Sequence, residues 1–150
     1  MAIKIEHRKG TLGEIVSMAY EELSNLADEA QEIVDNASEG LSQTQRVQTF
    51  EQTAQDLYDA QNEPDIPDGM GEHEVDYQVW SNKNKRRSLS RANRCAWACA
   101  LLETAIDAID SVISEGGFKG VSNDDAESYK DELDNMKSNA EGCEFPGMYG

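Results

Sequence analysis

Residues 92–113, ANRCAWACALLETAIDAIDSVI, decide the fold of this chain. Their apolar positions recur at alternating separations of three and four residues, a spacing that keeps them on one face of an α-helix. The positions are Ala92, Cys95, Cys99, Leu102, Ile106, Ile109 and Ile113. Further alanines and a leucine widen this face on both sides. The pattern predicts a central helix that begins between Ser81 and Ser88 and ends at Gly116 and Gly117, where glycine favours a helix end.

Three other segments share this period and predict three more helices, over residues 12–37, 43–61 and 123–141. Each follows a polar residue that has a second polar residue three positions later, the arrangement that caps the first free amides of a helix. The pairs are Thr11 with Glu14, Ser42 with Gln45, and Ser122 with Asp125.

Each segment has an apolar stripe and a polar back, so none is stable alone. Packing the four stripes together predicts an all-α four-helix bundle of antiparallel hairpins, as a single domain over residues 1–150. A long acidic loop is expected at 62–80, between the second and third helices. An N-terminal arm is expected at 1–10 and a C-terminal tail at 142–150.

Two short segments alternate apolar and polar residues, as half-buried strands do. One contains Ile3 and Ile5, and the other contains Val75, Tyr77 and Val79. Two interpretations stay open: a minor two-stranded β ribbon beside the bundle, or an irregular arm at each place. Isolated two-stranded ribbons are marginally stable in water.

The chain has no apolar run near the roughly 20 residues that span a bilayer, and its first residues lack the apolar stretch of a secretory signal. It has three cysteines, Cys95, Cys99 and Cys143. This number is small and odd, which argues against a disulfide framework. These features predict a soluble protein without membrane contact, in the cytoplasm or within a virion.

Charge is the strongest compositional feature, with 30 acidic against 13 basic residues and a formal net charge of -17. Residues 10–82 hold seventeen of the acids and one base, Arg46. This balance argues against sequence-independent DNA binding, which relies on cations that replace counterions on phosphates. The acidic surface either keeps the protein soluble or binds a partner, and the expected partner is a protein or a second copy of the chain.

Residues 83–94 reverse this balance with six cations and no acid: Lys83, Lys85, Arg86, Arg87, Arg91 and Arg94. Cations at a helix start are disfavoured by the helix dipole, by roughly 0.3 to 1 kcal/mol each. An acid of this chain, an acid of another copy or a nucleic-acid phosphate would relieve the repulsion, and we favour the acids because they are abundant. With Trp80 before the cluster and Phe145 and Tyr149 in the tail, these cations are the candidate partner-binding residues.

An enzymatic hypothesis rests on Glu29 with Glu32 and Asp56 with Asp59, two pairs of carboxylates on successive predicted helices. Such spacing puts two carboxylates on one helix face, as magnesium sites often require. Over about thirty residues the pattern resembles the all-α nucleotide pyrophosphohydrolases. The resemblance implies magnesium-dependent hydrolysis of nucleotides.

No other catalytic or metal-binding pattern emerges. Cys95 and Cys99 share a helix face, but zinc sites normally need at least three protein ligands, so we predict small core residues there and neither a metal nor a cofactor. The first functional prediction is a non-enzymatic interaction or assembly subunit, such as a phage structural or accessory protein. The alternatives are an acidic DNA mimic that inhibits a nucleic-acid-binding protein, of the anti-restriction or anti-CRISPR type, and the magnesium-dependent hydrolase.

Overall fold

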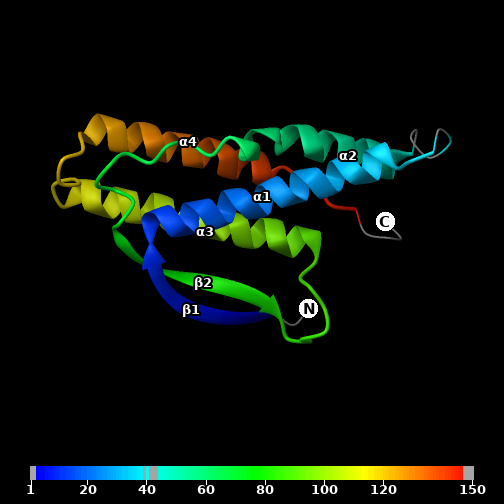
Figure 1. The fold of residues 1–150 in the computed structure, drawn as a ribbon, viewed down its shortest axis with the longest axis horizontal. Coiled ribbons are helices and arrows are strands. Elements are labelled where there is room, and N and C mark those ends of the chain that lie inside the picture. Colours follow the sequence, from blue (N-terminus) through cyan, green and yellow to red (C-terminus); the bar gives the residue numbers. More distant parts are fainter. Residues whose placement is uncertain (1–2, 39, 41–43, 147–150) are drawn as a thin grey trace.

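The computed structural model describes residues 3–38, 40 and 44–146, which form four α-helices, one short 3-10 helix and two strands (Figure 1). None of the helices in this part of the chain is long and apolar enough to cross a membrane. In chain order the elements are β1 (Ile3–Thr11), α1 (Leu12–Asp35), α2 (Gln45–Asp56), the 3-10 helix η1 (Tyr58–Gln61), β2 (Glu74–Asn82), α3 (Arg91–Ser114) and α4 (Asn123–Glu141).

The prediction of an all-α fold is wrong. β1 and β2 pair in antiparallel fashion along their whole length, with Ile3 opposite Asn82 and Thr11 opposite Glu74. The fold is therefore mixed α/β, with four helices and a two-stranded sheet. Strand β1 replaces the arm expected at 1–10, and β2 replaces the end of the loop expected at 62–80. Of the two interpretations of the alternating segments, the ribbon is the one that forms.

The ribbon is stable because it packs on α3, which lies beside β2 (Figure 1). Val75 and Tyr77 of β2 are buried in the main core. The indole nitrogen of Trp97 in α3 also donates a hydrogen bond of 2.8 Å to the backbone oxygen of Gln78. Burial of one sheet face and this bond supply the stability that a free ribbon lacks.

The four helices do not close into a bundle. α1 packs against α2 and α3, and α3 packs against α4, whereas α2 and α4 are not a packed pair. Figure 1 shows α2 and α4 following one another along the same side of the molecule, with the ribbon on the opposite side of α3. α1 and α3 therefore form the centre of the fold.

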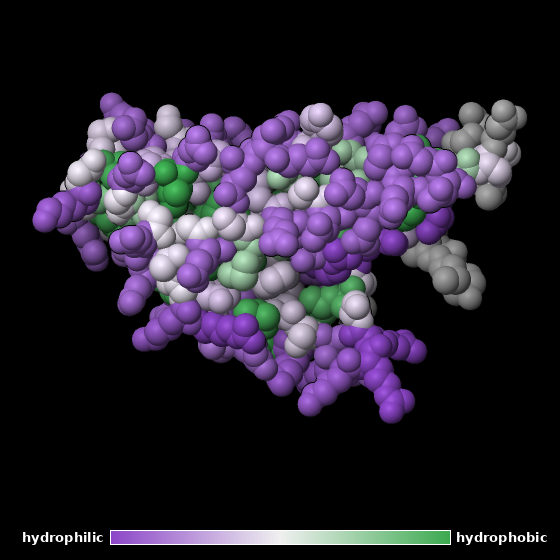
Figure 2. Space-filling model, viewed as in Figure 1, coloured by the Kyte–Doolittle hydropathy of each residue, from purple (hydrophilic) through white to green (hydrophobic). Residues whose placement is uncertain are grey.

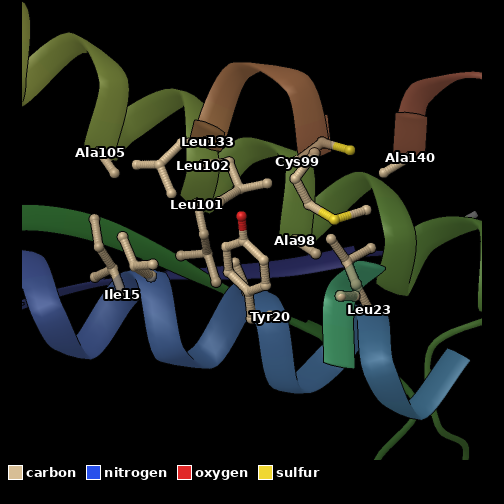
Figure 3. Packing of buried hydrophobic residues seen from close by; sticks show 14 of the residues in the cluster. Ile15, Tyr20, Leu23, Ala98, Cys99, Leu101, Leu102, Ala105, Leu133 and Ala140 are labelled. Atoms are coloured by element: carbon tan, nitrogen blue, oxygen red, sulfur yellow. The ribbon is translucent and has the colours of Figure 1, made fainter. Parts of the chain in front are cut away.

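The main core lies between α1, α3, α4 and β2. Figure 3 shows part of it, where Tyr20 and Leu23 of α1 meet Leu101 and Leu102 of α3 and Leu133 of α4. A second, smaller cluster joins Ala30 of α1 to Phe50 and Ala54 of α2. The separate cluster follows from the arrangement of the helices, because α2 contacts only the later part of the α1 stripe.

Local capping signals locate the starts of α1 and α4 correctly. The capping box of Thr11 and Glu14 is present at α1, and Ser122 caps α4 by accepting from the Asp125 backbone amide. The central helix begins later than expected, at Arg91, because Ser90 caps it.

The second helix also differs from the prediction. Thr44 caps α2, and the predicted cap at Ser42 lies outside the described residues. α2 ends at Asp56, and η1 continues the turn to Gln61.

The turn between α3 and α4 requires glycine at position 117. Gly117 has a φ of 96°, and its amide donates to the Val112 oxygen at 2.8 Å, which closes the end of α3. A Cβ there would lie 2.5 Å from Oδ1 of Asn123. Gly117→Ala should therefore lower the free energy of unfolding by about 1–2 kcal/mol in a urea titration. Gly40→Ala is the matched control, since a Cβ at Gly40 meets nothing within 4 Å; equal losses in the two variants would contradict the prediction.

Candidate partner-binding site

The connection from β2 to α3 presents four exposed cations in residues 83–87, which we call the basic loop: Lys83, Lys85, Arg86 and Arg87. Asparagine side chains shape its backbone. The Asn84 amide donates to Oδ1 of Asn82 at 2.9 Å, and the Arg86 amide donates to Oδ1 of Asn84 at 3.1 Å. Such bonds from a side chain to the backbone two residues on stabilise tight turns. The backbone that carries the four cations therefore has a defined conformation.

Within the described part of the chain, none of the four cations of the basic loop forms an ion pair. The chain around them is strongly acidic, with a net charge of -17. Figure 2 shows hydrophilic side chains projecting from the corner where β2 leads into α3. The positive charge of the loop is thus available to a partner.

Arg91 and Arg94, the other two cations of the predicted cluster, turn to α1 instead. Nη1 and Nη2 of Arg94 lie 3.0 Å and 2.7 Å from the two carboxylate oxygens of Glu29, and its Nε donates to Glu22. Arg91 donates from Nε to Glu29 at 3.0 Å. A two-pronged arginine–carboxylate pair is among the stronger charged hydrogen bonds. Acids of the same chain therefore neutralise the start of α3.

These contacts shift the ionisation of both partners. Hydrogen bonding from Arg94 and Arg91 holds the pKa of Glu29 below its ordinary value, against an opposing effect of burial. Hydrogen bonding to Glu29 and Glu22 likewise raises the pKa of Arg94. The side chains of Arg94 and Glu22 are each only 20% exposed, so water screens their interaction weakly.

Glu22 was not predicted as a partner of the cations. Glu22 and Glu29 are two helical turns apart, beside the apolar stripe of α1, which is the signal that places both on one side of the helix. Nothing local in the sequence indicates that this side meets the start of α3.

Trp80 lies directly opposite Ile5 of β1 and, unlike its neighbour Val79, is not among the partly buried residues packed on the main core. Its indole nitrogen donates to the side-chain oxygen of Gln78 at 3.0 Å, and Ile5 is 48% exposed. Both residues are near the end of the ribbon that leads into the basic loop. We call Ile5, Trp80 and the basic loop together the ribbon tip. Ile5 was not among the predicted site residues, because the alternation of β1 is typical of a half-buried strand and gave no sign that Ile5 is exposed.

The tail residues have different positions. Phe145 is partly buried against both core clusters, and Thr53 of α2 donates to the Glu144 oxygen at 2.8 Å. The first residues of the tail therefore fold back on the helices, and Phe145 contacts its own chain. Tyr149 lies outside the described residues.

The two carboxylate pairs of the enzymatic hypothesis are not assembled into a metal site. Glu29 is bound by arginines, Asp56 accepts from Gln52 at 2.9 Å, and Asp59 lies on η1. Among the described residues, no group of three or more His, Cys, Asp or Glu side chains is arranged to hold a metal ion.

The three cysteines border one cavity of about 580 Å³ between α3, α4 and the tail. All three are free thiols. Cys95 and Cys99 are buried, and Cys95 donates to the Ala140 oxygen at 3.4 Å. Burial raises the pKa of Cys143 to about 12, which keeps this thiol protonated and unreactive at neutral pH. Small core residues are the role that these contacts give Cys95 and Cys99.

The ribbon tip thus combines four cations with an exposed isoleucine and a half-buried tryptophan. None of the four cations pairs with an acid among the residues that the structure describes. Arginine and tryptophan are enriched among the residues that contribute most to protein interfaces. This combination attracts an acidic surface by charge and adds apolar contact once the surface is docked. Comparisons of the chain with protein-family models, with curated proteins and with solved structures find no match.

Proposed function

We propose that this protein is a non-enzymatic assembly subunit that docks its ribbon tip onto an acidic protein surface. The observation that carries the proposal is the basic loop, whose four cations have no described acidic partner although the chain holds 30 acidic residues. A patch of cations that abundant acids of the same chain do not neutralise is suited to contact with another molecule.

The local structure supports docking because the loop backbone is already shaped before a partner binds. The Asn82 and Asn84 side chains already shape the loop backbone. The ribbon before the loop is anchored on α3, and the helix after it is anchored on α1 by Arg94. Preorganised groups lose less conformational entropy on binding, so more of the charge attraction appears as affinity.

A second copy of the chain supplies the complementary surface. Residues 10–82 hold seventeen acids and one base, and most of the acids in α1 and α2 are exposed. A contact between the basic loop of one copy and the acidic helices of the next uses two different patches. Such head-to-tail contacts form rings or filaments. An assembly subunit of this kind suits a phage structural or accessory protein, which acts either in the cytoplasm or within the virion.

The test is a charge reversal of the loop, Arg86→Glu with Arg87→Glu. The control, Lys9→Glu with Lys119→Glu, changes the net charge equally at exposed sites away from the ribbon tip. At about 50 mM salt, light scattering should give an oligomer for the wild type and the control but a monomer for the loop variant. About 0.5 M salt should dissociate the wild type, because ionic attraction between exposed groups is screened.

A partner other than a second copy is covered by affinity recovery from the native host. There the loop variant should lose an acidic protein that the wild type and the control retain. Identical masses and identical recovered proteins for all three chains would reject the proposal. If duplex DNA instead displaces a partner that the loop variant still retains, that partner binds the acidic surface, which is then acting as a mimic of nucleic acid.

A further inference from the structure

A second cleft lies on the far side of α1 from the ribbon, between η1 with its following loop and α4. Its volume is about 280 Å³. The floor is formed by buried Tyr20 and Met136. The walls carry Asp59 and Asn62 on the η1 side, and Glu132 and Asn135 on α4. We call this the acidic cleft; it shares no residue with the ribbon tip.

Tyr20 is an unusual floor residue because its hydroxyl has no partner. The residue is 4% exposed, and the hydroxyl makes no hydrogen bond to any described residue. Figure 3 shows this hydroxyl pointing from α1 toward α3 and α4. No fully enclosed side-chain oxygen or nitrogen in the described part lacks a partner, so the hydroxyl must open onto the cleft that Tyr20 lines. The hydroxyl is therefore a polar group at the base of the cleft that the chain itself leaves without a partner and that a ligand entering the cleft can reach.

The charges around the hydroxyl are all negative. Burial raises the pKa of Tyr20, and the carboxylates of Glu132, Glu63 and Asp59 raise it further. Tyr20 therefore stays a neutral phenol, able to accept a hydrogen bond at its oxygen. Burial and the nearby carboxylates, Glu63 first, raise the pKa of the buried Tyr129 in the same way. No cationic side chain of the described chain lines the cleft.

The wall residues also lack partners. Within the described part of the chain, the side chains of Asp59, Asn62, Glu132 and Asn135 form no hydrogen bond or ion pair. By contrast, Asp110 of α3 is paired with a lysine at 2.7 Å. The cleft thus offers unused hydrogen-bond acceptors on opposite walls and above its floor, without a compensating positive charge.

This arrangement favours an organic cation over a metal ion. No described group of three or more carboxylate, cysteine or histidine side chains is arranged to hold a metal. An ammonium group donates up to three hydrogen bonds, and its alkyl chain can rest on an apolar floor such as Met136. Two carboxylates on opposite walls match two ammonium groups, and the volume of about 280 Å³ suits a small molecule.

We propose that the acidic cleft binds a small aliphatic diamine, with Asp59 and Glu132 each holding one ammonium group and the Tyr20 hydroxyl accepting from one of them. The inference is independent of the ribbon tip and of assembly. It is tested by the affinities of three ligands that share a four-carbon chain.

Isothermal titration calorimetry at about 0.15 M salt tests the ligand class with putrescine, n-butylamine and 1,4-butanediol. Putrescine should bind about tenfold more tightly than n-butylamine, because only putrescine pairs with both carboxylates, and the neutral diol should give no heat of binding. Equal affinity for the diamine and the monoamine, or no heat with putrescine, would overturn the proposal.

Variants test the site itself. Asp59→Asn with Glu132→Gln should weaken putrescine binding about a hundredfold, and Glu51→Gln with Glu115→Gln, an equal charge change at exposed positions outside the cleft, should leave it unchanged. Tyr20→Phe removes only the hydroxyl and should weaken binding about threefold to tenfold. If both double variants weaken binding equally, the diamine is attracted to the acidic protein as a whole, and the site is rejected.

Discussion

Leu102→Ala is expected to lower the free energy of unfolding by about 3–4 kcal/mol, the largest effect of any substitution considered for this protein. Leu102 lies in the middle of α3 and is 0% exposed. Figure 3 shows it within the core where α3 meets α1 and α4. Truncation removes three buried carbon atoms and leaves a cavity that three rigid helices cannot close. The loss therefore includes both the hydrophobic transfer free energy and the cost of the cavity.

The matched control for this prediction is Ile5→Ala, which removes an aliphatic side chain of the same size from a site that is 48% exposed. It should cost less than about 1 kcal/mol. Urea titrations followed by circular dichroism at 222 nm give both values, and an unchanged slope of the transition would show that the unfolded states are comparable. Similar losses for the two variants would mean that α3 is not at the centre of the core.

Arg94→Ala should lower the free energy of unfolding by about 2–3 kcal/mol at neutral pH. The substitution removes the ion pairs of Arg94 with Glu22 and Glu29 and leaves these two carboxylates close together and partly buried. Arg94→Lys should recover only part of the loss, since one ammonium cannot reproduce the two-pronged contact with Glu29. Arg86→Ala is the control, because it removes the same charge from an exposed residue of the basic loop and should change stability by less than about 0.5 kcal/mol.

This contribution should depend on pH in a defined direction. The pKa of Glu29 is lower in the folded protein than its ordinary value of 4.5, so ionised Glu29 stabilises the fold. That stabilisation is fully present above pH 4.5 and is lost as the pH falls through the lower, folded-state pKa. The stability difference between the wild type and Arg94→Ala should therefore be constant from pH 7 to about 5 and shrink below about 4.5. A difference that is independent of pH down to 3 would show that the pair with Glu29 contributes nothing.

Helix identity and the starts of α1 and α4 were predictable because their causes are local. The capping box of Thr11 and Glu14 and the cap at Ser122 act within one turn of the chain, and the apolar spacing of residues 92–113 reports which side of α3 is buried. The start of α3 was less certain because several serines stand before it, and only the backbone geometry selects Ser90.

The charge distribution of the candidate site was likewise visible in the sequence, since residues 83–94 hold six cations and no acid. The sequence did not show which of those cations pair with acids of the same chain. Arg94 meets Glu22 and Glu29 only because α1 and α3 pack together, which leaves the basic loop as the part without a described acidic partner.

By itself, the sequence determined four amphipathic helices, an acidic surface and one basic segment, because residues near one another along the chain cause all three. Only the tertiary structure decided that β1 and β2 pair, that α2 and α4 stay apart, and that the Tyr20 hydroxyl opens onto an acidic cleft. These features join segments far apart in the chain. Each depends on a balance between the entropy of closing long loops and the burial gained on contact, and no local pattern of residues records that balance.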